Sequence, residues 1–224
     1  MRHLVVGAGE VGTAVAAVLS RSHPTQLRDI EPVEDEADVL DVCIPWQPGF
    51  VDIVHKYAEQ HRARLVVVHS TVPTGTCDRE GWVHSPIRGR HPDLEDGVAT
   101  FVKHFGGGNA EEAALDWKDC GVSTAVHPRA AETEAGKLWE LVQFGLQVRV
   151  EKAIHSWCTE NGLDPEVVYT AMAHTYNNGY EQLGEHWAIR PVLKHMPGEI
   201  GGHCVVPMSE LLDHPISRMV KEGL

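Results

Sequence analysis

The glycine-rich run near the start of the chain constrains the fold more than any other feature. A short apolar run, Leu4-Val5-Val6, leads directly into Gly7-Ala8-Gly9-Glu10-Val11-Gly12. Apolar residues then recur at helical spacing from Glu10 to Leu19. A strand, a tight glycine turn and a helix in this order open a βαβ unit. The sequence therefore predicts an α/β protein with a parallel sheet.

Each glycine of this run has a physical reason to be there. In a G-x-G-x-x-G turn, Gly7 permits the tight turn, Gly9 lets the backbone approach a pyrophosphate, and Gly12 allows close packing of the helix. The helix amino terminus, at Glu10 and Val11, supplies positive dipole to phosphate groups. These positions predict a Rossmann-type, dinucleotide-binding domain.

An acidic residue indicates which dinucleotide. Asp29 stands 17 residues after Gly12, at the end of a predicted second strand, Thr25–Asp29. A carboxylate there accepts both ribose hydroxyls of the adenosine and disfavours a 2′-phosphate. NAD is therefore the predicted cofactor, while Arg28 leaves room for NADP. Nothing else in the chain resembles a flavin cradle, so FAD is disfavoured.

The rest of the chain has two parts. Up to about residue 128, short apolar runs alternate with helical stretches, which predicts strands at Val39–Ile44, Leu65–His69, Trp82–His84, Val102–Phe105 and Ser123–Val126, with a helix at Phe50–Arg62. A long helical pattern, Arg129–Asn161, follows and ends at Gly162; a second one covers Asp164–Met172. The expected domains are a Rossmann domain over 1–128 and a smaller helical domain over 129–224.

Composition excludes several partners. The formal net charge of −13 disfavours nucleic acid and anionic membranes, which bind basic faces. The five cysteines are spread out with no Cys-x-x-Cys pair, so neither a disulfide framework nor a structural zinc site is predicted. No apolar stretch is long enough to span a bilayer. We expect a cytoplasmic protein with a small-molecule substrate.

Four segments resemble the UDP-glucose and GDP-mannose 6-dehydrogenases. Ser70-Thr71-Val72-Pro73-Thr74-Gly75-Thr76 resembles their S-T-V-P-x-G-T, and Val42-Cys43-Ile44-Pro45 resembles the strand end beside the nicotinamide. Glu134-Ala135-Gly136-Lys137 resembles the E-x-x-K that opens their long central helix, and Gly201-Gly202-His203-Cys204 resembles their G-G-H-C. The segments fall in the family's order.

The resemblance implies a chemistry. Family members oxidise the C6 alcohol of a nucleotide sugar to a carboxylate with two NAD molecules in turn, through a thiohemiacetal and a thioester on cysteine. Here Cys204 would be the nucleophile, which must act as a thiolate. Lys137 would stabilise negative charge at the reacting oxygen, and Thr71 would position a water. Ser70, Thr71 and Pro45 would lie against the cofactor. The family's long helix also forms its dimer interface, so a homodimer is expected.

The chain departs from the family at other positions. Ser85-Pro86-Ile87 lacks the glutamate of the family's Pro-Glu; Leu141 stands where the family has asparagine, and Met208 where it has aspartate. The family also continues into a nucleotide-sugar-binding domain, whereas this sequence stops 20 residues after Cys204. The resemblance therefore predicts a shortened relative with a different or smaller substrate.

Basic residues replace the Pro-Glu loop. Arg88-Gly89-Arg90-His91 would present two guanidinium groups to an anionic substrate, with His203 beside the thiol of Cys204. The alternative, that Arg88 and Arg90 are solvated loop residues, stays open.

The histidines and tryptophans have simpler interpretations. Several histidines gather in the last third of the chain, but no H-x-x-H or H-E-x-x-H spacing occurs, so no metal site is predicted. Trp139, Trp157 and Trp187 are interpreted as core or dimer-contact residues.

Two other functions remain open. One is a two-electron dehydrogenase resembling the hydroxyisobutyrate and 6-phosphogluconate group, in which Lys137 acts as acid–base group and Cys204 is dispensable. The other is a dinucleotide-binding protein without catalysis, suggested by the missing glutamate, asparagine and aspartate.

Overall fold

The computed structural model describes residues 1–29, 36–90, 93–200 and 204–222. His91 and the Gly201-Gly202-His203 part of the last motif lie outside these ranges. The chain divides into two compact units, Met1–Lys137 and Leu138–Leu224. The predicted domain boundary at residue 128 stays a prediction; it falls just before a continuous helix, α6 (Ala130–Glu160).

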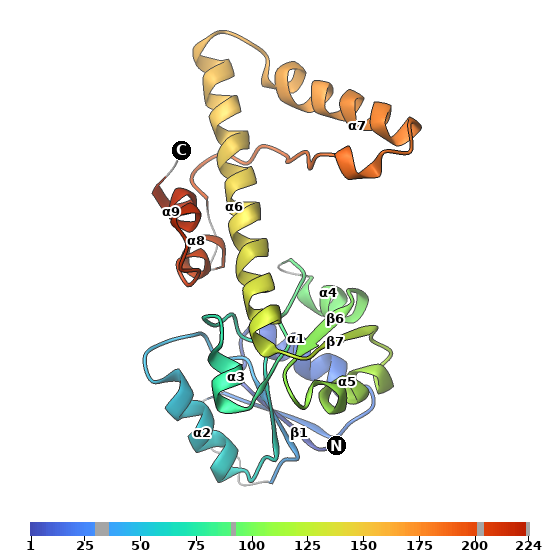
Figure 1. Cartoon of the computed structure of the whole chain (residues 1–224), viewed down its shortest axis with the longest axis vertical. Coiled ribbons are helices and arrows are strands. Elements are labelled where there is room, and N and C mark those ends of the chain that lie inside the picture. The colour runs from blue at the N-terminus through green and yellow to red at the C-terminus, as the bar shows by residue number, and fades with distance from the viewer. Residues whose placement is uncertain (30–35, 91–92, 201–203, 223–224) are drawn as a thin grey trace. The chain divides into compact units, whose positions relative to one another are not determined.

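The first unit is built on one sheet of seven strands, in the order β2-β1-β3-β4-β5-β6-β7 (Figure 1). All neighbouring strands pair in parallel except β5 and β6, which are antiparallel. This confirms the predicted α/β, Rossmann-type fold. The strands are β1 (His3–Val6), β2 (Thr25–Arg28), β3 (Val39–Val42), β4 (Leu65–Val68), β5 (Val83–His84), β6 (Lys103–Gly106) and β7 (Thr124–His127).

Helices cover both faces of the sheet. Because the central strands are buried on both sides, they are almost wholly apolar, and every residue of β1, β3 and β4 is buried. Alternate residues feed two cores: Val5 and Val67 pack in one with Trp117, and Leu4 and Phe50 in the other. The covering helices are α1 (Glu10–Leu19), α2 (Phe50–Gln60), α3 (Thr76–Glu80), α4 (Leu94–Thr100) and α5 (Ala110–Asp119).

Three of these helices, α3, α4 and α5, were not predicted. In α5 the buried stripe is real but consists mostly of small residues, Ala110, Ala113 and Ala114, ending on Trp117. Alanine contributes little to an apolar pattern, although it favours helix. The stripe was therefore hidden in a segment that otherwise looks acidic.

In the second unit α6 fulfils the prediction of a long helix. The helix predicted over Asp164–Met172 is longer than expected: it begins as a π-helical stretch, η1 (Glu166–Ala171), and continues as α7 (Met172–Gln182). No proline interrupts this run, so it continues until Gly184, whose φ is +74°. The remaining elements are η2 (His186–Ala188), α8 (Val205–Ser209) and α9 (Pro215–Glu222).

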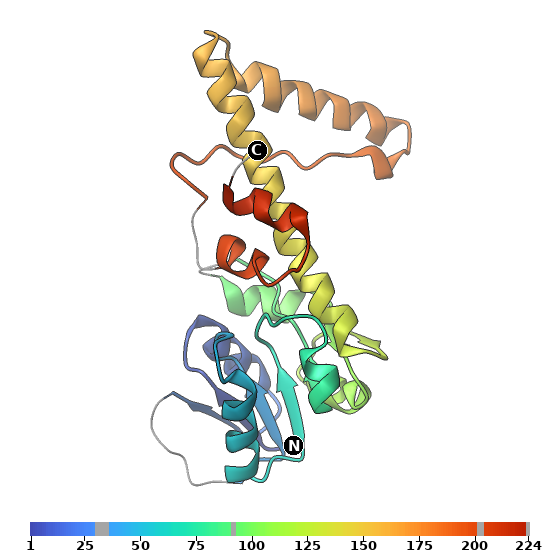
Figure 2. The same ribbon diagram turned by 60° about the vertical axis from the view of Figure 1, so that its left-hand side comes forward.

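The short helices α8 and α9 lie beside α6 in both ribbon views (Figure 2). Val220 of α9 is buried, and a Cβ added at Gly145 of α6 would lie 2.5 Å from one of its methyl groups. Arg149 donates hydrogen bonds to the carbonyls of Val220 (2.9 Å) and Lys221 (2.7 Å). Gly145 and Arg149 therefore hold the end of α9 against α6.

The tryptophans of this unit are not core residues. Trp139, Trp157 and Trp187 are 42%, 53% and 82% exposed, so the core interpretation is wrong for all three. Contact with a partner remains open. Among the described residues no helix is long and apolar enough to cross a membrane.

Candidate functional site

The predicted cofactor residues gather at one edge of the sheet. Because β1 to β5 all run in parallel, their carboxyl ends share an edge. Gly7 follows β1, Asp29 follows β2, Cys43 follows β3 and Ser70 follows β4. The chain passes from β1 to β2 on one side and then to β3 on the other, which makes a topological switch point between β1 and β3. Ligands of open α/β sheets bind in the crevice at such a point.

The three glycines of the turn have different steric surroundings. Gly7 has φ +105°, and a Cβ there would come 2.8 Å from the Cys43 carbonyl carbon. A Cβ at Gly12 would come 1.8 Å from the Gly7 oxygen, closer than any real contact. A Cβ at Gly9 would meet nothing within 4 Å. Gly7 and Gly12 are therefore required by the fold, whereas Gly9 faces open space at the start of α1.

The end of β2 separates two neighbouring charges. Arg28 is buried: its guanidinium lies 4.6 Å from the centre of the Tyr57 ring and donates a 2.6 Å hydrogen bond to His61 Nε2. Asp29 is exposed. Arg28, the cation that could have bound the 2′-phosphate of NADP, thus points into the protein, and the Asp29 carboxylate faces solvent.

Ser70 connects two of the resemblance segments. Its buried hydroxyl donates to the carbonyls of Ile44 (2.5 Å) and Val42 (3.3 Å), which fixes the end of β3 against the end of β4. Thr71 is half-buried and Pro45 is exposed beside this junction. The Ser70 hydroxyl thus holds the two strand ends together, while Thr71 and Pro45 have accessible surface beside it. Contact of Ser70, Thr71 and Pro45 with the cofactor stays a prediction.

Glu134 connects two further segments. It is fully buried and accepts hydrogen bonds from the amides of Gly75 (2.5 Å) and Cys77 (2.8 Å) at the start of α3. In return Asp78 of α3 accepts from the amides of Ala130 (2.7 Å) and Ala131 (3.2 Å) at the start of α6. The two helices cap each other, because each supplies a carboxylate to the free amides of the other.

Lys137 lies at the same edge of the sheet. Its ammonium donates a 2.9 Å hydrogen bond to the Ile87 carbonyl, two residues past Ser85 at the end of β5. The neighbouring carbonyl of Ser85 accepts from Lys103 at 3.3 Å. Lys137 and Lys103 thus both hold the segment that follows β5.

Lys103 was missed by sequence reasoning. It is buried in β6, 4.4 Å from the Trp117 ring, and burial lowers its pKa to about 7. Its ammonium is 3.3 Å from His69 Nδ1, and His69 Nε2 is 2.9 Å from Asp41. A lysine within an apolar strand pattern was the available signal, since buried lysines need partners.

Cys204 belongs to the second unit, where it is exposed immediately before α8. The other cysteines are less accessible: Cys77, Cys120 and Cys158 are buried, and Cys43 is half-buried. Desolvation by burial raises the pKa of Cys43 and Cys77, which disfavours their reactive thiolates. The accessibility of Cys204 suits a nucleophile, but that role stays a prediction.

The predicted substrate arginines have separate surroundings. Arg88 is half-buried, with its guanidinium 5.9 Å from the centre of the Phe101 ring. The side chain of Arg90 is 85% exposed and lies 3.5 Å from Asp93. Both follow β5, at the carboxyl edge. Their contact with an anionic substrate stays a prediction.

By sequence the chain matches no family description and no curated protein. By structure it resembles dehydrogenases. A UDP-D-ManNAc dehydrogenase from Pyrococcus horikoshii aligns with a TM-score of 0.81 and 16% identity over 99% of this chain and 67% of the other. A GDP-mannose dehydrogenase from Pseudomonas aeruginosa aligns at 0.64 and 15% identity over 99% and 67%.

A smaller dehydrogenase shares the same plan. A 3-hydroxyisobutyrate dehydrogenase from Mycobacterium tuberculosis aligns with a TM-score of 0.65 and 15% identity over 98% of this chain and 91% of the other. The structural resemblance to nucleotide-sugar dehydrogenases is thus confirmed at the level of the fold, and this chain spans about two thirds of their length.

Proposed function

We propose that this protein is an NAD-dependent oxidoreductase that acts on an alcohol or aldehyde. The observation that carries the proposal is the glycine turn at the switch point. Neighbouring backbone atoms leave no room for a side chain at Gly7 and Gly12, whereas Gly9 faces open space. This arrangement suits the approach of a pyrophosphate to the amino terminus of α1. The dehydrogenase fold of the structural neighbours agrees with it.

The residues present fit NAD better than NADP. The exposed carboxylate of Asp29 would accept the ribose hydroxyls and repel a 2′-phosphate. Arg28, the cation nearest in sequence, is occupied by Tyr57 and His61. The nicotinamide, when bound, supplies the hydride chemistry.

The proposed roles of the chain's own groups follow from their positions. Lys137 would hold positive charge at the carboxyl edge, where an alkoxide oxygen of the substrate develops. Thr71 would position a water or the nicotinamide, and Cys204 would attack a carbonyl as a thiolate. The substrate would be a small or anionic alcohol, met by Arg88 and Arg90 with His91 and His203. The family groups replaced by Ile87, Leu141 and Met208 argue against complete oxidation of a nucleotide sugar.

Steady-state assays test the proposal. Purified protein would be incubated with NAD and a panel of UDP-sugars, GDP-mannose and small hydroxy acids, and NADH formation followed by absorbance. We expect turnover with at least one anionic alcohol and weaker turnover with NADP. Turnover with none of them, by a protein that binds NAD, would favour the non-catalytic alternative.

Two variants separate the covalent from the non-covalent enzyme. If the mechanism is covalent, both Cys204→Ser and Lys137→Met lose activity. In a two-electron enzyme of the hydroxyisobutyrate type, Cys204→Ser stays active and Lys137→Met does not. The match over 91% of a 3-hydroxyisobutyrate dehydrogenase and the hydrogen bond that holds Lys137 at the carboxyl edge favour this second candidate.

We also propose that the chain is a homodimer through α6 and α7. A groove of about 610 Å³ runs between these helices, lined by Leu146, Val150 and Ile154 of α6 and by Met172 of α7. Val150 and Met172 are 46% and 64% exposed. Exposed apolar surface of this kind marks an interface. The free cysteines fit a reducing compartment such as the cytoplasm.

A further inference from the structure

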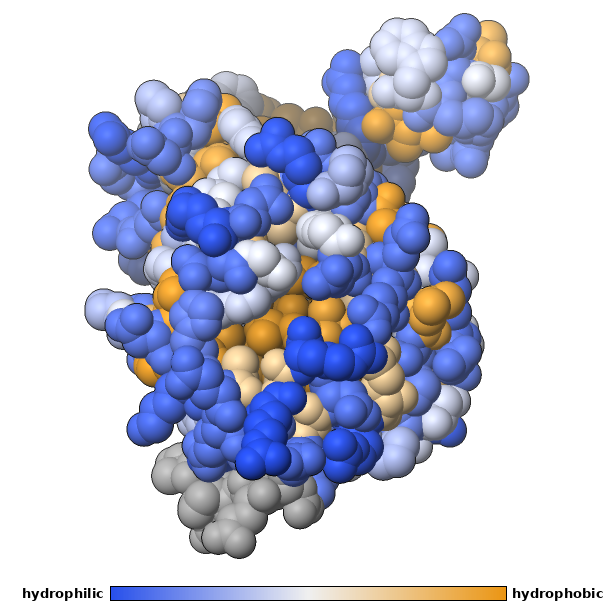
Figure 3. Space-filling model, turned by 60° about the horizontal axis from the view of Figure 1, so that its bottom comes forward, coloured by the Kyte–Doolittle hydropathy of each residue, from blue (hydrophilic) through white to orange (hydrophobic). Residues whose placement is uncertain are grey.

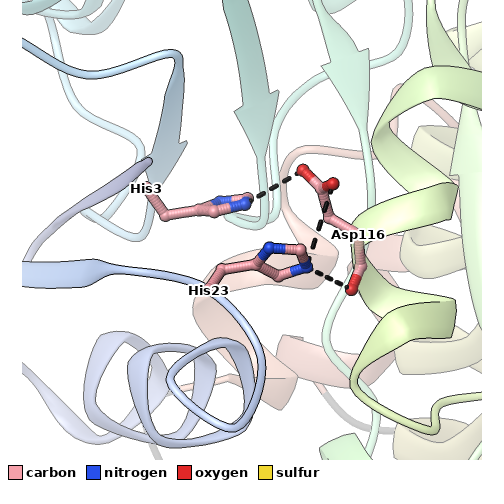
Figure 4. A group of neighbouring side chains, drawn as sticks. All are labelled: His3, His23 and Asp116. Carbon is pink, nitrogen blue, oxygen red and sulfur yellow. Dashed lines mark hydrogen bonds and ion pairs between the residues drawn. The ribbon is translucent and has the colours of Figure 1, made fainter. Parts of the chain in front are cut away.

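A second group of polar side chains is buried at the opposite end of the sheet. His3 is the first residue of β1, His23 lies in the turn that precedes β2, and Asp116 belongs to α5 (Figure 4). Their side chains are 2%, 9% and 8% exposed. The amino ends of β1 to β5 share the edge opposite to the glycine turn, because these strands run in parallel. With the bottom of Figure 1 turned forward, hydrophilic side chains surround an apolar patch (Figure 3). The group is therefore separate from the glycine turn at the carboxyl edge.

The three side chains converge on one point. His3 Nε2 is 3.0 Å from Asp116 Oδ2, and His23 Nε2 is 3.8 Å from Asp116 Oδ1. One ligand atom from each residue lies within 4.8 Å of the others. Bonds of about 2.0–2.2 Å to a zinc ion place neighbouring ligand atoms a little over 3 Å apart. Rotation of the side chains would have to bring the three ligand atoms to this spacing, with other ligands completing the shell.

A further carboxylate orients the first histidine. His3 Nδ1 is 2.7 Å from Asp41 Oδ2, while the other oxygen of Asp41 is 2.9 Å from His69 Nε2. A carboxylate on the far nitrogen fixes the tautomer and the ring of a metal-binding histidine. His3 thus presents Nε2 to Asp116 from a ring that is already held.

The site also favours a cation. Burial alone would lower the pKa of His3, but Asp41 and Asp116 outweigh it and raise the pKa to about 9. His3 lies between two buried carboxylates, Asp41 at 2.7 Å and Asp116 at 3.0 Å, and these negative charges favour a cation in the group.

We propose that His3, His23 and Asp116 bind a divalent transition-metal ion of the zinc type, with Asp41 as the outer carboxylate. Two imidazoles and one carboxylate suit zinc, cobalt or nickel rather than magnesium or calcium. The ion would join β1, the turn before β2 and α5. The sequence did not indicate this site because its ligands stand at positions 3, 23 and 116.

Binding requires two local changes. His23 Nε2 lies 3.0 Å from the carbonyl oxygen of Asp116, and its Nδ1 lies 3.3 Å from the amino group of Met1. To coordinate through Nε2, His23 must give up the bond to the carbonyl and carry its proton on Nδ1. The Met1 ammonium can only donate to Nδ1, so it must then move away from the ring. Asp119, 3.9 Å from His23, is the other charged group near the ring.

The test is titration of chelator-treated full-length protein with Zn²⁺ by calorimetry, and with Co²⁺ by visible absorption. We expect one ion per chain. His23→Gln should weaken binding at least as much as Asp41→Asn, for which loss of an outer carboxylate predicts about 10–100-fold. His55→Gln, an exposed histidine paired with Glu80, is the matched control and should leave affinity unchanged. Circular dichroism would confirm that each variant is folded.

The proposal is overturned if folded wild-type protein binds no ion. It is also overturned if His23→Gln and His55→Gln bind alike. In these cases the group is an internal ion-pair network centred on protonated His3. The outcome is independent of NAD binding, which depends on the other edge of the sheet.

Discussion

The two units of this protein bury their residues very differently. In the first unit polar groups are drawn into the interior and paired: Glu134 caps α3, Asp78 caps α6, and Asp41 joins His3 to His69. In the second unit large apolar side chains stay exposed along α6, η1 and α7, including Phe144, Val150, Trp157, Val167 and Met172.

This difference predicts that mutations in the two units affect different properties, namely folding in the first unit and assembly in the second. The first unit pairs the buried charges named above within itself, so its stability and its proposed cofactor site depend on the same internal contacts. The second unit leaves apolar surface that a partner would cover. Changes in the first unit should therefore alter folding, and changes on the surface of the second should alter assembly. The predictions below are ordered by their expected effect on the free energy of unfolding.

Gly12→Ala should have the largest effect. Its new Cβ would lie 1.8 Å from the Gly7 oxygen, so α1 must move away from β1. Overpacking typically costs about 1–3 kcal/mol, and the upper end applies here because the atoms in the way belong to the Gly7 backbone. NAD binding should be lost as well. Urea unfolding and NAD calorimetry measure both. The matched control is Gly108→Ala, whose Cβ meets nothing within 4 Å; equal stability of the two variants would contradict the packing account.

Glu134→Ala should lower the free energy of unfolding by about 3 kcal/mol, because it leaves the buried amide of Cys77 and the half-buried amide of Gly75 without their charged acceptor. Glu132→Ala, an exposed change in the same turn of α6, should stay within about 0.5 kcal/mol of wild type. Chemical denaturation of both variants checks this. Similar midpoints would show that the reciprocal caps do not stabilise the unit.

The stability due to His3 should depend on pH. Its folded pKa of about 9 lies above the ordinary value of 6.5, so this stability is fully present below pH 6.5 and is lost as pH rises through 9. Comparing wild type with His3→Gln in chelator, the difference in unfolding free energy should shrink by about 2 kcal/mol between pH 7 and 9.

Lys103 acts in the opposite direction over part of this range. Burial lowers its pKa from 10.5 to about 7, so the loss of stability that this lysine causes is greatest below pH 7 and shrinks as pH rises from 7 towards 10.5. Both proteins carry Lys103, so the comparison largely cancels this contribution. A difference that stays constant from pH 6 to 9 would show that His3 is not the titrating group.

Met172→Glu should change the stability of the first unit least and the assembly most. Met172 is 64% exposed beside the α6–α7 groove, so a carboxylate there costs little in an isolated chain but would be buried in a dimer. Light scattering should show a dimer for wild type and a monomer for the variant, with NAD affinity unchanged. Thr175→Glu, an exposed change in the same helix, is the control. A monomeric wild type would refute the proposed interface.

Local patterns predicted the fold well and the pairing of buried charges poorly. The glycine turn, the strands and α6 depend on residues that are only a few positions apart in the sequence. Local patterns were therefore enough to predict them. The inward turn of Arg28 depends on Tyr57 and His61, and the partners of His3 come from β3 and α5. Contacts between residues so distant in sequence leave no periodic signal. The role of Glu134 was likewise hidden inside a motif chosen for its lysine.

The central claim is that the carboxyl edge of the first unit binds NAD at an open glycine. The most direct test is calorimetric titration of wild type and Gly9→Ala with NAD and NADP, with thermal melts of both proteins. The account predicts one NAD per chain, NADP binding at least about tenfold weaker, and a Gly9→Ala variant that melts like wild type but binds NAD poorly. Folded wild-type protein that binds neither dinucleotide, or a Gly9→Ala variant that binds NAD as well as wild type, would contradict it.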